Sequence, residues 1–309
     1  MPQARHPNPA DASLKGKVIL ITGAGSGIGA ATAVELQRRG AIPVLADCDA
    51  DALAIANAML DPTALTITGD VTLAGDCEDM VASTLAQYGR LDVIWANAGI
   101  ASFGPLAHTD PLAWRRCIDV NVFGVFNTVR AALPEIVRTK GFVVVSASVS
   151  SFAHPPGVSA YAASKAAVEA MSNAWRIELS AHGVGVGVIH ASWIRTPLVT
   201  EGNMHPGFRR LRATMPAVLN REVDAAKAAQ MIADGIERRS RQIWVPGWVK
   251  ALHWLRAFLH SPLGERELIR AAPEIESLFL EGLQTSTVKA SSFPPRELAR
   301  AIARGDASG

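Results

Sequence analysis

The chain has 309 residues, 49% of them hydrophobic, which is enough apolar material for one large α/β domain with an appendage or for two modest domains. Lysine and arginine total 30 against 28 acidic residues, a formal net charge of +2, so the chain lacks the broad basic field of a nucleic-acid-binding protein. The three cysteines, Cys48, Cys77 and Cys117, have neither C-x-x-C spacing nor nearby histidines, which argues against a disulfide scaffold or a structural zinc site.

The first residues, 1–14, are rich in proline, alanine and polar side chains. They lack the charged start and continuous apolar run of a secretory signal, so we expect a disordered leader. No apolar run in the sequence is long enough to span a bilayer. Together with cysteines whose spacing suits neither a disulfide scaffold nor a zinc site, these features predict a soluble protein of the reducing cytoplasm without a bound metal.

From residue 17 onward, short β-rich runs alternate with longer amphipathic stretches, the pattern of βαβ units. Strands are predicted over 18–22, 42–47, 64–70, 92–97, 142–148, 184–190 and 242–246, and helices over 27–39, 50–60, 75–88, 112–140, 159–182 and 221–238. This order predicts an α/β fold with a doubly wound, seven-stranded parallel sheet, whose ligands bind beyond the carboxyl ends of the strands. We expect residues 15–249 to form this domain and 250–309 to form a mainly helical extension.

A glycine-rich turn follows the first predicted strand, with the sequence Thr22-Gly23-Ala24-Gly25-Ser26-Gly27-Ile28-Gly29. Glycines let the backbone turn tightly and approach a pyrophosphate, and the N-terminus of the following helix offers free N–H groups. A nucleoside triphosphate P-loop needs Gly-Lys-Ser/Thr, but Ala30 follows Gly29 here. The turn therefore predicts a dinucleotide site, the alternative being a purely structural strand-to-helix turn.

Asp47 ends the second predicted strand, where a carboxylate accepts hydrogen bonds from both hydroxyls of an adenosine ribose and repels a 2′-phosphate. Ser26 and Cys48 occupy the places where a lysine or arginine would bind that phosphate. NAD is therefore preferred over NADP. The alternative role for Asp47 is a helix cap, which suits Asp49 better.

Tyr161 and Lys165 lie one helical turn apart in Tyr161-Ala-Ala-Ser-Lys165, and the chain has only 2 tyrosines. A free phenol titrates near ~10, and an ammonium at i+4 on the same helix face favours the phenolate. In isolation this spacing is more often a surface helix pair. The glycine turn and the other motifs of the chain make a catalytic role for this pair the better interpretation.

Together these motifs resemble the short-chain dehydrogenase/reductase family. The resemblance spans roughly residues 15 to 250 and depends on T-G-x-x-x-G-x-G at 22–29, Asp70-Val71, Asn97-Ala98-Gly99, Asn121, Ser148, and Tyr161 with Lys165. It implies a Rossmann fold in which Asp70 and Val71 hold the adenine and Asn97 supports the central strand. The cofactor site it implies comprises Gly23, Ser26, Gly27, Ile28, Gly29, Asp47, Asp70, Val71, Asn97, Ala98, Gly99, Tyr161, Lys165, Ile194 and Thr196.

The resemblance also implies a catalytic tetrad of Asn121, Ser148, Tyr161 and Lys165. Tyr161 would take the hydroxyl proton of an alcohol as hydride leaves for the nicotinamide, or return it to a ketone. Lys165 would lower the pKa of Tyr161 and hold the cofactor ribose. Ser148 would hydrogen-bond the substrate oxygen, and Asn121 would hold a water that relays protons from Lys165.

After the sixth predicted strand, Ala191-Ser192 replaces the Pro-Gly that the family usually has, and Trp193 adds bulk. Ile194 and Thr196 keep the positions expected to contact the nicotinamide carboxamide. The following stretch, 198–219, suits a mobile lid over an apolar substrate, or an ordinary connecting loop. His154 is expected to make a structural contact. The 198–219 stretch contains the apolar residues Met204, Phe208, Leu211 and Met215.

The resemblance stops after Val249, where Trp248, Leu252, Leu255 and Leu259 have the spacing of one helical stripe. Packing of this stripe over the substrate pocket or a neighbouring subunit is favoured, with reversible docking on a membrane surface and plain core packing as alternatives. Residues from Gln284 onward are polar and are expected to wrap the surface or fray.

These observations predict an NAD-dependent oxidoreductase for a hydrophobic secondary alcohol or ketone, steroid-like or lipid-like. Two alternatives are an epimerase or dehydratase on the same scaffold and a non-catalytic dinucleotide-binding regulator. The resemblance implies a homodimer or homotetramer formed by the helices that carry Asn121 and Tyr161.

Overall fold

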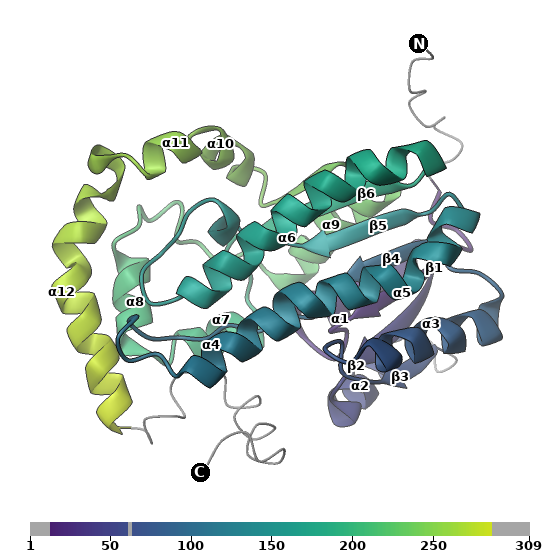
Figure 1. Cartoon of the computed structure of the whole chain (residues 1–309), viewed down its shortest axis with the longest axis horizontal. Helices are drawn as coiled ribbons and strands as arrows, with labels where there is room; N and C mark the ends of the chain where they lie inside the picture. Colours follow the sequence, from purple (N-terminus) through teal and green to yellow (C-terminus); the bar gives the residue numbers. More distant parts are fainter. Residues whose placement is uncertain (1–12, 61–63, 286–309) are drawn as a thin grey trace.

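The computed structural model describes residues 13–60 and 64–285. Most of the expected leader, 1–12, and the polar tail from 286 lie outside the described residues. Within these ranges, a central sheet is covered by helices on both faces, and a chain of helices follows one edge (Figure 1).

The central sheet has seven parallel strands in the order β3-β2-β1-β4-β5-β6-β7, which confirms the predicted doubly wound fold. The order reverses between β1 and β4, and such a reversal opens a crevice at the carboxyl ends of the strands. The expected strand over 64–70 is shorter than predicted. The strands are β1 (Val18–Thr22), β2 (Ile42–Asp47), β3 (Thr66–Thr68), β4 (Val93–Ala96), β5 (Phe142–Ser146), β6 (Gly185–Ala191) and β7 (Gln242–Val245).

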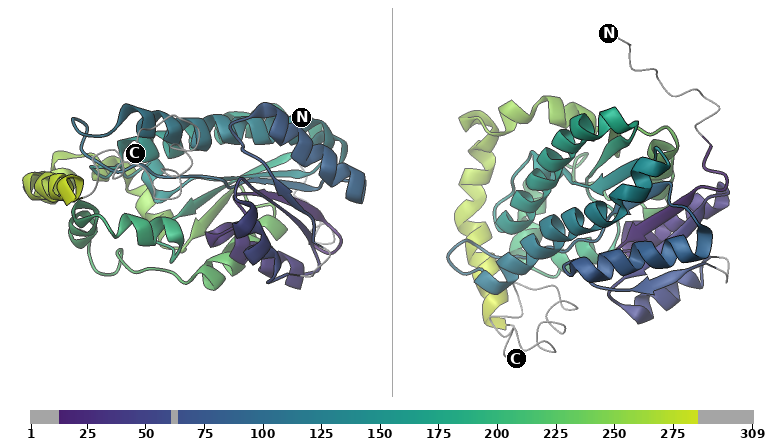
Figure 2. Two further views of the ribbon diagram at one scale, coloured as in Figure 1. Left: turned by 90° about the horizontal axis from the view of Figure 1, so that it is seen from below. Right: turned by 45° about the vertical axis from the view of Figure 1, so that its right-hand side comes forward.

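Helices cover both faces of the sheet, as Figure 2 shows edge-on. Apolar residues of α1, α2 and α9 pack on one face, and those of α3, α5 and α6 pack on the other. The helices of the domain are α1 (Gly27–Arg38), α2 (Ala50–Asn57), α3 (Ala74–Tyr88), α4 (Pro111–Ile118), α5 (Gly124–Arg138), α6 (Ser159–Glu178), α7 (Pro197–Gly202), α8 (Pro206–Ala213) and α9 (Ala225–Glu237), with 3-10 turns η3 (Val149–Ser151) and η4 (Leu179–His182).

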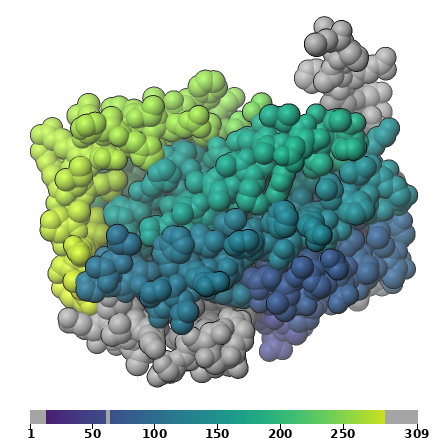
Figure 3. Space-filling model, in the orientation of Figure 1, coloured from purple at the N-terminus to yellow at the C-terminus, as the bar shows by residue number. Residues whose placement is uncertain are grey.

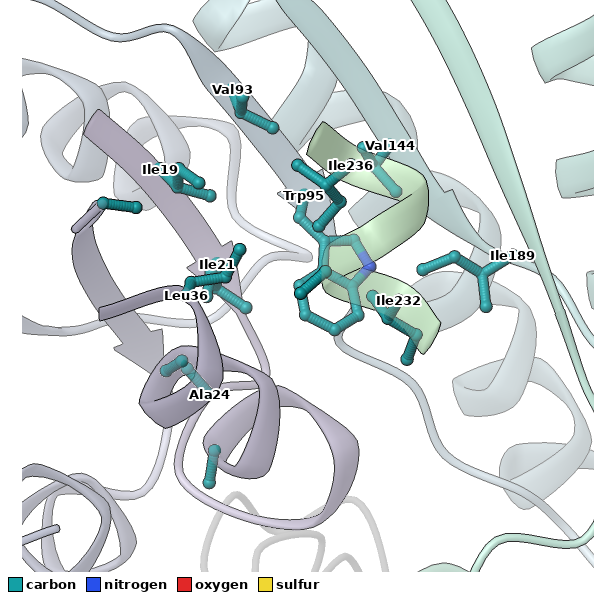
Figure 4. Close-up of a cluster of buried hydrophobic side chains, with 14 of the residues drawn as sticks. Ile19, Ile21, Ala24, Leu36, Val93, Trp95, Val144, Ile189, Ile232 and Ile236 are labelled. Atoms are coloured by element: carbon teal, nitrogen blue, oxygen red, sulfur yellow. The ribbon is translucent and has the colours of Figure 1, made fainter. Parts of the chain in front are cut away.

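Alternation along each strand divides the core into two layers. Ile19 and Ile21 of β1 face α1 and α9, whereas Val18 and Leu20 face the opposite layer, because successive side chains of a strand point to opposite faces. Trp95 of β4 is fully buried at the centre of the first layer (Figure 4). Its indole Nε1 donates a hydrogen bond to Ser146 Oγ at 2.9 Å, so the core is joined directly to the end of β5.

The predicted helix over 112–140 is interrupted. A five-residue π-helical segment, η2 (Asp119–Phe123), separates α4 from α5. Segments of this kind are rare and occur often at functional sites, because they redirect side chains within a helix. Asn121 lies in the middle of this segment and is fully buried.

Three helices form the extension, α10 (Val249–Trp254), α11 (Arg256–Leu259) and α12 (Pro262–Thr285). They run along the upper and left edges of the molecule (Figure 3). The predicted stripe of Trp248, Leu252, Leu255 and Leu259 is wrong, because the helix breaks at Leu255, which is 56% exposed. Instead, His253 faces the domain, with its Nε2 at 3.4 Å from Glu169 Oε1 and its ring edge-on to Phe152.

In the described part of the chain, no helix combines the length and the apolar character that crossing a bilayer requires.

Candidate active site

A cavity of about 280 Å³ lies beyond the carboxyl ends of β1, β2, β4, β5 and β6, at the position that a doubly wound sheet predicts for its ligand. One end is lined by the glycine turn and the acidic residues after β2, and the other by apolar side chains. Most of the expected site residues line it, namely Gly23, Ser26, Gly27, Ile28, Asp47, Asp70, Val71, Asn97, Ala98, Gly99, Ser148, Tyr161, Lys165, Ile194 and Thr196. Gly29 and Asn121 are not among its lining residues.

The glycine turn has the geometry of an anion cradle. Gly23 and Gly27 have φ of +65° and +58°, a region that favours glycine. Gly29 lies under the turn, where a Cβ would collide with the Gly23 carbonyl and the Asn97 side chain. Ser26 precedes α1 without capping it through its side chain, and Gly27 and Ile28 of the first turn of α1 line the cavity, so this end of the cavity suits a pyrophosphate.

Two aspartates, one at the end of β2 and one just after it, have different partners. Asp47 Oδ2 accepts a hydrogen bond from Gly25 N at 3.0 Å, and its Oδ1 accepts one from Asp49 N at 3.1 Å. Asp49 caps α2 by accepting from Ala52 N at 2.9 Å. The helix-cap role thus falls to Asp49, as expected, and the Asp47 carboxylate borders the cavity beside the turn.

Asp70 is held by an arginine that the sequence analysis missed. Arg116 of α4 donates to Asp70 Oδ2 at 2.8 Å, and Thr72 donates to Oδ1 through its backbone and its hydroxyl. Burial of Asp70 acts to raise its pKa, but these hydrogen bonds and the Arg116 charge outweigh burial and lower it. Arg116 and Asp70 both line the cavity. Little in the sequence distinguishes Arg116 as a site residue, because it lies in a predicted amphipathic helix in which an arginine is expected on the exposed face.

Asn97 joins three strands below the cavity. Its Nδ2 donates to the carbonyls of Thr22 and Gly23 at 3.0 and 3.1 Å, and its Oδ1 accepts from Ser146 Oγ at 3.0 Å. The resemblance implied this supporting role. Asn97 thereby fixes the glycine turn relative to β5, which leads to Ser148.

Tyr161, Lys165 and Ser148 meet on the cavity wall. Lys165 is 4% exposed. Its Nζ donates to Ser146 O at 2.8 Å and lies 5.5 Å from the Tyr161 ring centroid. Ser148 Oγ accepts from Ser150 N at 3.1 Å, and a hydrogen bond with Ser148 acts to lower the Tyr161 pKa. The phenol, the hydroxyl and the ammonium therefore share one small region.

Asn121 lies behind this region and makes its hydrogen bonds within the protein. Its Oδ1 accepts from Ile100 N at 2.8 Å, and its Nδ2 donates to Ile100 O and to Ser164 Oγ, each at 2.9 Å. A Cβ on Gly99 would lie 3.2 Å from both Asn121 Oδ1 and Lys165 Nζ. Asn121 thus holds the segment after β4 against α6, and Gly99 allows the close approach of both side chains.

The expected lowering of the Tyr161 pKa by Lys165 is wrong for the protein alone. Burial raises the pKa of Tyr161 to about 12, against the opposing effect of Ser148. Burial also lowers the pKa of Lys165 to about 8. Desolvation disfavours the charged form of each group, and the Lys165 amine is directed at the Ser146 carbonyl rather than at the phenol oxygen.

The other end of the cavity is apolar and lies under α7 and α8. Trp193 is held between two side chains of α8, the Phe208 ring edge-on at 5.7 Å and the Arg212 guanidinium at 4.7 Å. Arg212 Nη1 pairs with Glu222 at 2.8 Å. The 198–219 stretch therefore contains helices anchored in the core, and its mobility stays a prediction. The apolar lining comprises Ile100, Ala101, Phe103, Val158, Trp193, Leu198, Val199 and Phe208.

His154 is not among the cavity-lining residues. It stacks on His260 of the extension at 4.6 Å, and His260 Nε2 lies 3.0 Å from Phe152 O. The expected structural contact therefore joins the extension to the segment between Ser148 and Tyr161.

A family model described as short chain dehydrogenase matches residues 17–206. The chain belongs to the short-chain dehydrogenase family. It is 32% identical over 254 residues to the 11-beta-hydroxysteroid dehydrogenase-like 4A of Arabidopsis thaliana, covering 79% of this chain and 81% of that protein. It is also 34% identical over 208 residues to an uncharacterized oxidoreductase of Listeria innocua, covering 64% and 84% of the two chains.

Solved structures of the family have the same fold. A short-chain dehydrogenase/reductase of Burkholderia phymatum in complex with NAD has a TM-score of 0.70 at 26% identity, covering 81% of this chain and 97% of that one. The 3-ketoacyl-(acyl-carrier-protein) reductase of Brucella melitensis complexed with NADH has a TM-score of 0.68 at 26% identity, covering 75% and 98%. This chain is accordingly an oxidoreductase of the short-chain dehydrogenase family.

The depressed pKa of Lys165 predicts a pH-dependent stability. Between about pH 8 and pH 10.5, the unfolded chain holds a proton on this amine that the folded protein lacks. The free energy of unfolding therefore rises with pH in this window, by up to about 1.4 kcal/mol per pH unit from this group. Lys165→Met should lose this rise in urea unfolding at pH 8, 9 and 10. The exposed Lys250→Met should follow wild type, and parallel curves for all three proteins would contradict the burial effect.

Proposed function

We propose that this protein transfers a hydride between NAD and a hydrophobic secondary alcohol or ketone, with Tyr161 as the acid or base. The observation that carries the proposal is the convergence of Tyr161, Ser148 and Lys165 on one wall of a cavity whose other walls are the glycine turn and an apolar end. A proton-transfer group beside a dinucleotide cradle and an apolar substrate space is what alcohol oxidation requires.

The cavity fits a dinucleotide. A Cβ on Gly25 would crowd Ala52 and the Asp47 carboxyl group at about 3 Å, so glycine at this position lets the turn pack closely against the end of β2, beside the cavity. Gly23, Ser26 and Ile28 would hold the pyrophosphate, Asp47 the ribose, and Asp70 and Val71 the adenine. Ile194 and Thr196 would contact the nicotinamide carboxamide, and the nicotinamide ring would supply the hydride acceptor.

Each residue of the tetrad has a separate task in this proposal. Tyr161 is neutral in the protein alone, since its pKa is about 12, and so it is ready to donate a proton to a ketone oxygen. In alcohol oxidation it accepts the hydroxyl proton from the same oxygen position. Ser148 hydrogen-bonds that oxygen and stabilises its developing charge. Lys165 is the nearby cation that favours the phenolate once the site is loaded, and Asn121 positions the backbone around it.

The substrate is proposed to be apolar and of steroid-like or lipid-like character. The lining beyond Tyr161 is mainly aliphatic and aromatic, with Phe103, Val158 and Trp193 among its side chains and Glu201 of α7 as an acidic one. Relatives named 11-beta-hydroxysteroid dehydrogenase, at about 30% identity, support this substrate class.

Self-association is proposed through α4, α5 and α6. Three large apolar side chains on and between these helices are exposed, Phe123 (57%), Phe126 (45%) and Ile177 (74%), as suits burial in a dimer or tetramer. The cytoplasm remains the expected compartment.

The exposed Trp254 and Phe258 of the extension are proposed to pack against a neighbouring subunit or over the pocket, and reversible docking on a membrane surface is the less favoured alternative.

Replacing Tyr161 tests the catalytic proposal. Tyr161→Phe removes the acid–base oxygen and keeps the ring, so kcat for NADH formation from an apolar secondary alcohol should fall at least about 100-fold. Lys165→Ala should cause a fall of the same order. NAD affinity of the Phe variant, measured by fluorescence titration, should stay within about twofold. The matched control is Tyr88→Phe on α3, the other tyrosine, and near-wild-type turnover of Tyr161→Phe would sink the proposal.

Replacing Asp47 tests the cofactor preference. Arg116 and Lys165 are the cationic side chains among the described cavity-lining residues, and Arg116 already pairs with Asp70. Wild type should therefore prefer NAD over NADP by at least about 100-fold in kcat/KM, and Asp47→Ser should reduce this ratio at least about tenfold, roughly 1.4 kcal/mol. Asp51→Ser, an exposed aspartate in the first turn of α2, is the control. A wild-type preference for NADP would refute the assignment.

A further inference from the structure

The apolar end of the cavity belongs to a small core of its own, separate from the two sheet layers. This third cluster contains cavity-lining residues, among them Phe103, Val158 and Phe208, together with residues of α12. On α12, Ala271, Ile275 and Phe279 recur at i, i+4 and i+8 and are 7%, 2% and 3% exposed. Side chains at this spacing lie on one helix face, so a single stripe of α12 forms the rear layer behind the cavity wall.

Phe279 fits into a gap made by two glycines. A Cβ on Gly157, in the segment between Ser148 and Tyr161, would collide with the Phe279 ring, and so would a Cβ on Gly207 at the start of α8. Gly157 also has φ of +77°. Glycine therefore suits this position both because it lacks a Cβ and because it adopts positive φ readily. The Phe279 ring thus contacts two separate segments, and each is followed directly by a lining residue, Val158 and Phe208.

Further contacts hold α12 and these segments together. Arg210 Nε of α8 pairs with Glu274 Oε2 of α12 at 2.7 Å. Gly104 N donates to Gly157 O at 2.9 Å, which ties the segment of Phe103 to the same place. The segments that carry three lining side chains are therefore linked directly or through one hydrogen bond to α12, although Phe279 itself is not among the residues that line the cavity.

We propose that Phe279 is a specificity-determining positioning residue. It sets the size of the substrate end of the cavity by holding Val158 and Phe208 toward the cavity. The proposal builds on the proposed function, because it concerns the apolar substrate of the same site. Interiors are close-packed, so removing a ring leaves space into which neighbours can retreat. A shorter side chain at 279 should therefore admit bulkier alcohols and hold small ones less tightly.

The test compares two secondary alcohols of different size, cyclohexanol and testosterone, in Phe279→Ala and wild type. We expect the ratio of kcat/KM for testosterone over cyclohexanol to rise at least about tenfold, through KM. The kcat for cyclohexanol should stay within about threefold and the Kd of NAD within about twofold. Phe279→Leu, which keeps most of the buried apolar area at this position, should give an intermediate kcat/KM ratio. If the alanine variant does not fold, the ratio of the leucine variant tests the proposal.

Phe258→Ala is the matched control, because Phe258 lies on α11 of the same extension and is 49% exposed. It should leave the ratio unchanged. An unchanged ratio in the folded Phe279 variants, an equal loss on both alcohols, or the same shift in Phe258→Ala would overturn the proposal.

Calorimetric Kd values for both alcohols in the presence of NAD separate this proposal from the proposed function. Wild type that binds the alcohols without oxidising them contradicts the proposed function, and the ratio of Kd values then tests the role of Phe279 by itself. Wild type that binds neither alcohol overturns the role of Phe279 as well.

Discussion

The hydrogen bonds of one asparagine amide hold the site together. Asn97 bonds to two carbonyls at the end of β1 and to the Ser146 hydroxyl at the end of β5, across the point where the strand order reverses. The Ser146 hydroxyl also accepts the Trp95 indole hydrogen, so this network is anchored in the fully buried core. Buried polar networks with satisfied partners rigidify their surroundings. The glycine turn and the proton-transfer groups consequently keep a fixed relation.

Within the site that the Asn97 network holds together, burial determines the charge state of the reactive groups. Lys165 is buried and Tyr161 is half-buried, and desolvation moves their pKa values apart, that of Tyr161 up to about 12 and that of Lys165 down to about 8. The free protein therefore disfavours the ion pair that the sequence spacing suggested. In the proposed function, Lys165 favours the phenolate only once the site is loaded. Perturbed values of this kind are common where proton transfer is catalysed.

Much of this was predictable from the sequence, because the relevant signals are local. Strand periodicity located β1, β2 and β7 to within a residue, and the glycine turn and the Tyr161–Lys165 spacing indicated two ends of one cavity. Four features were not predictable. The π-helical segment around Asn121 changes the backbone within an uninterrupted helical pattern, the break at Leu255 interrupts an apolar spacing that continues through it, and the Arg116–Asp70 pair joins distant segments. The contact of Phe279 with Gly157 and Gly207 likewise depends on tertiary packing.

Absorbance at the reduced-nicotinamide band, recorded with NAD and a panel of apolar secondary alcohols, tests the central claim most directly. The account predicts that NADH accumulates with at least one of these alcohols, and that the corresponding ketone consumes NADH. Tight binding of NAD with no change in absorbance for any alcohol or ketone would contradict it, and would identify a protein that holds the dinucleotide without transferring hydride.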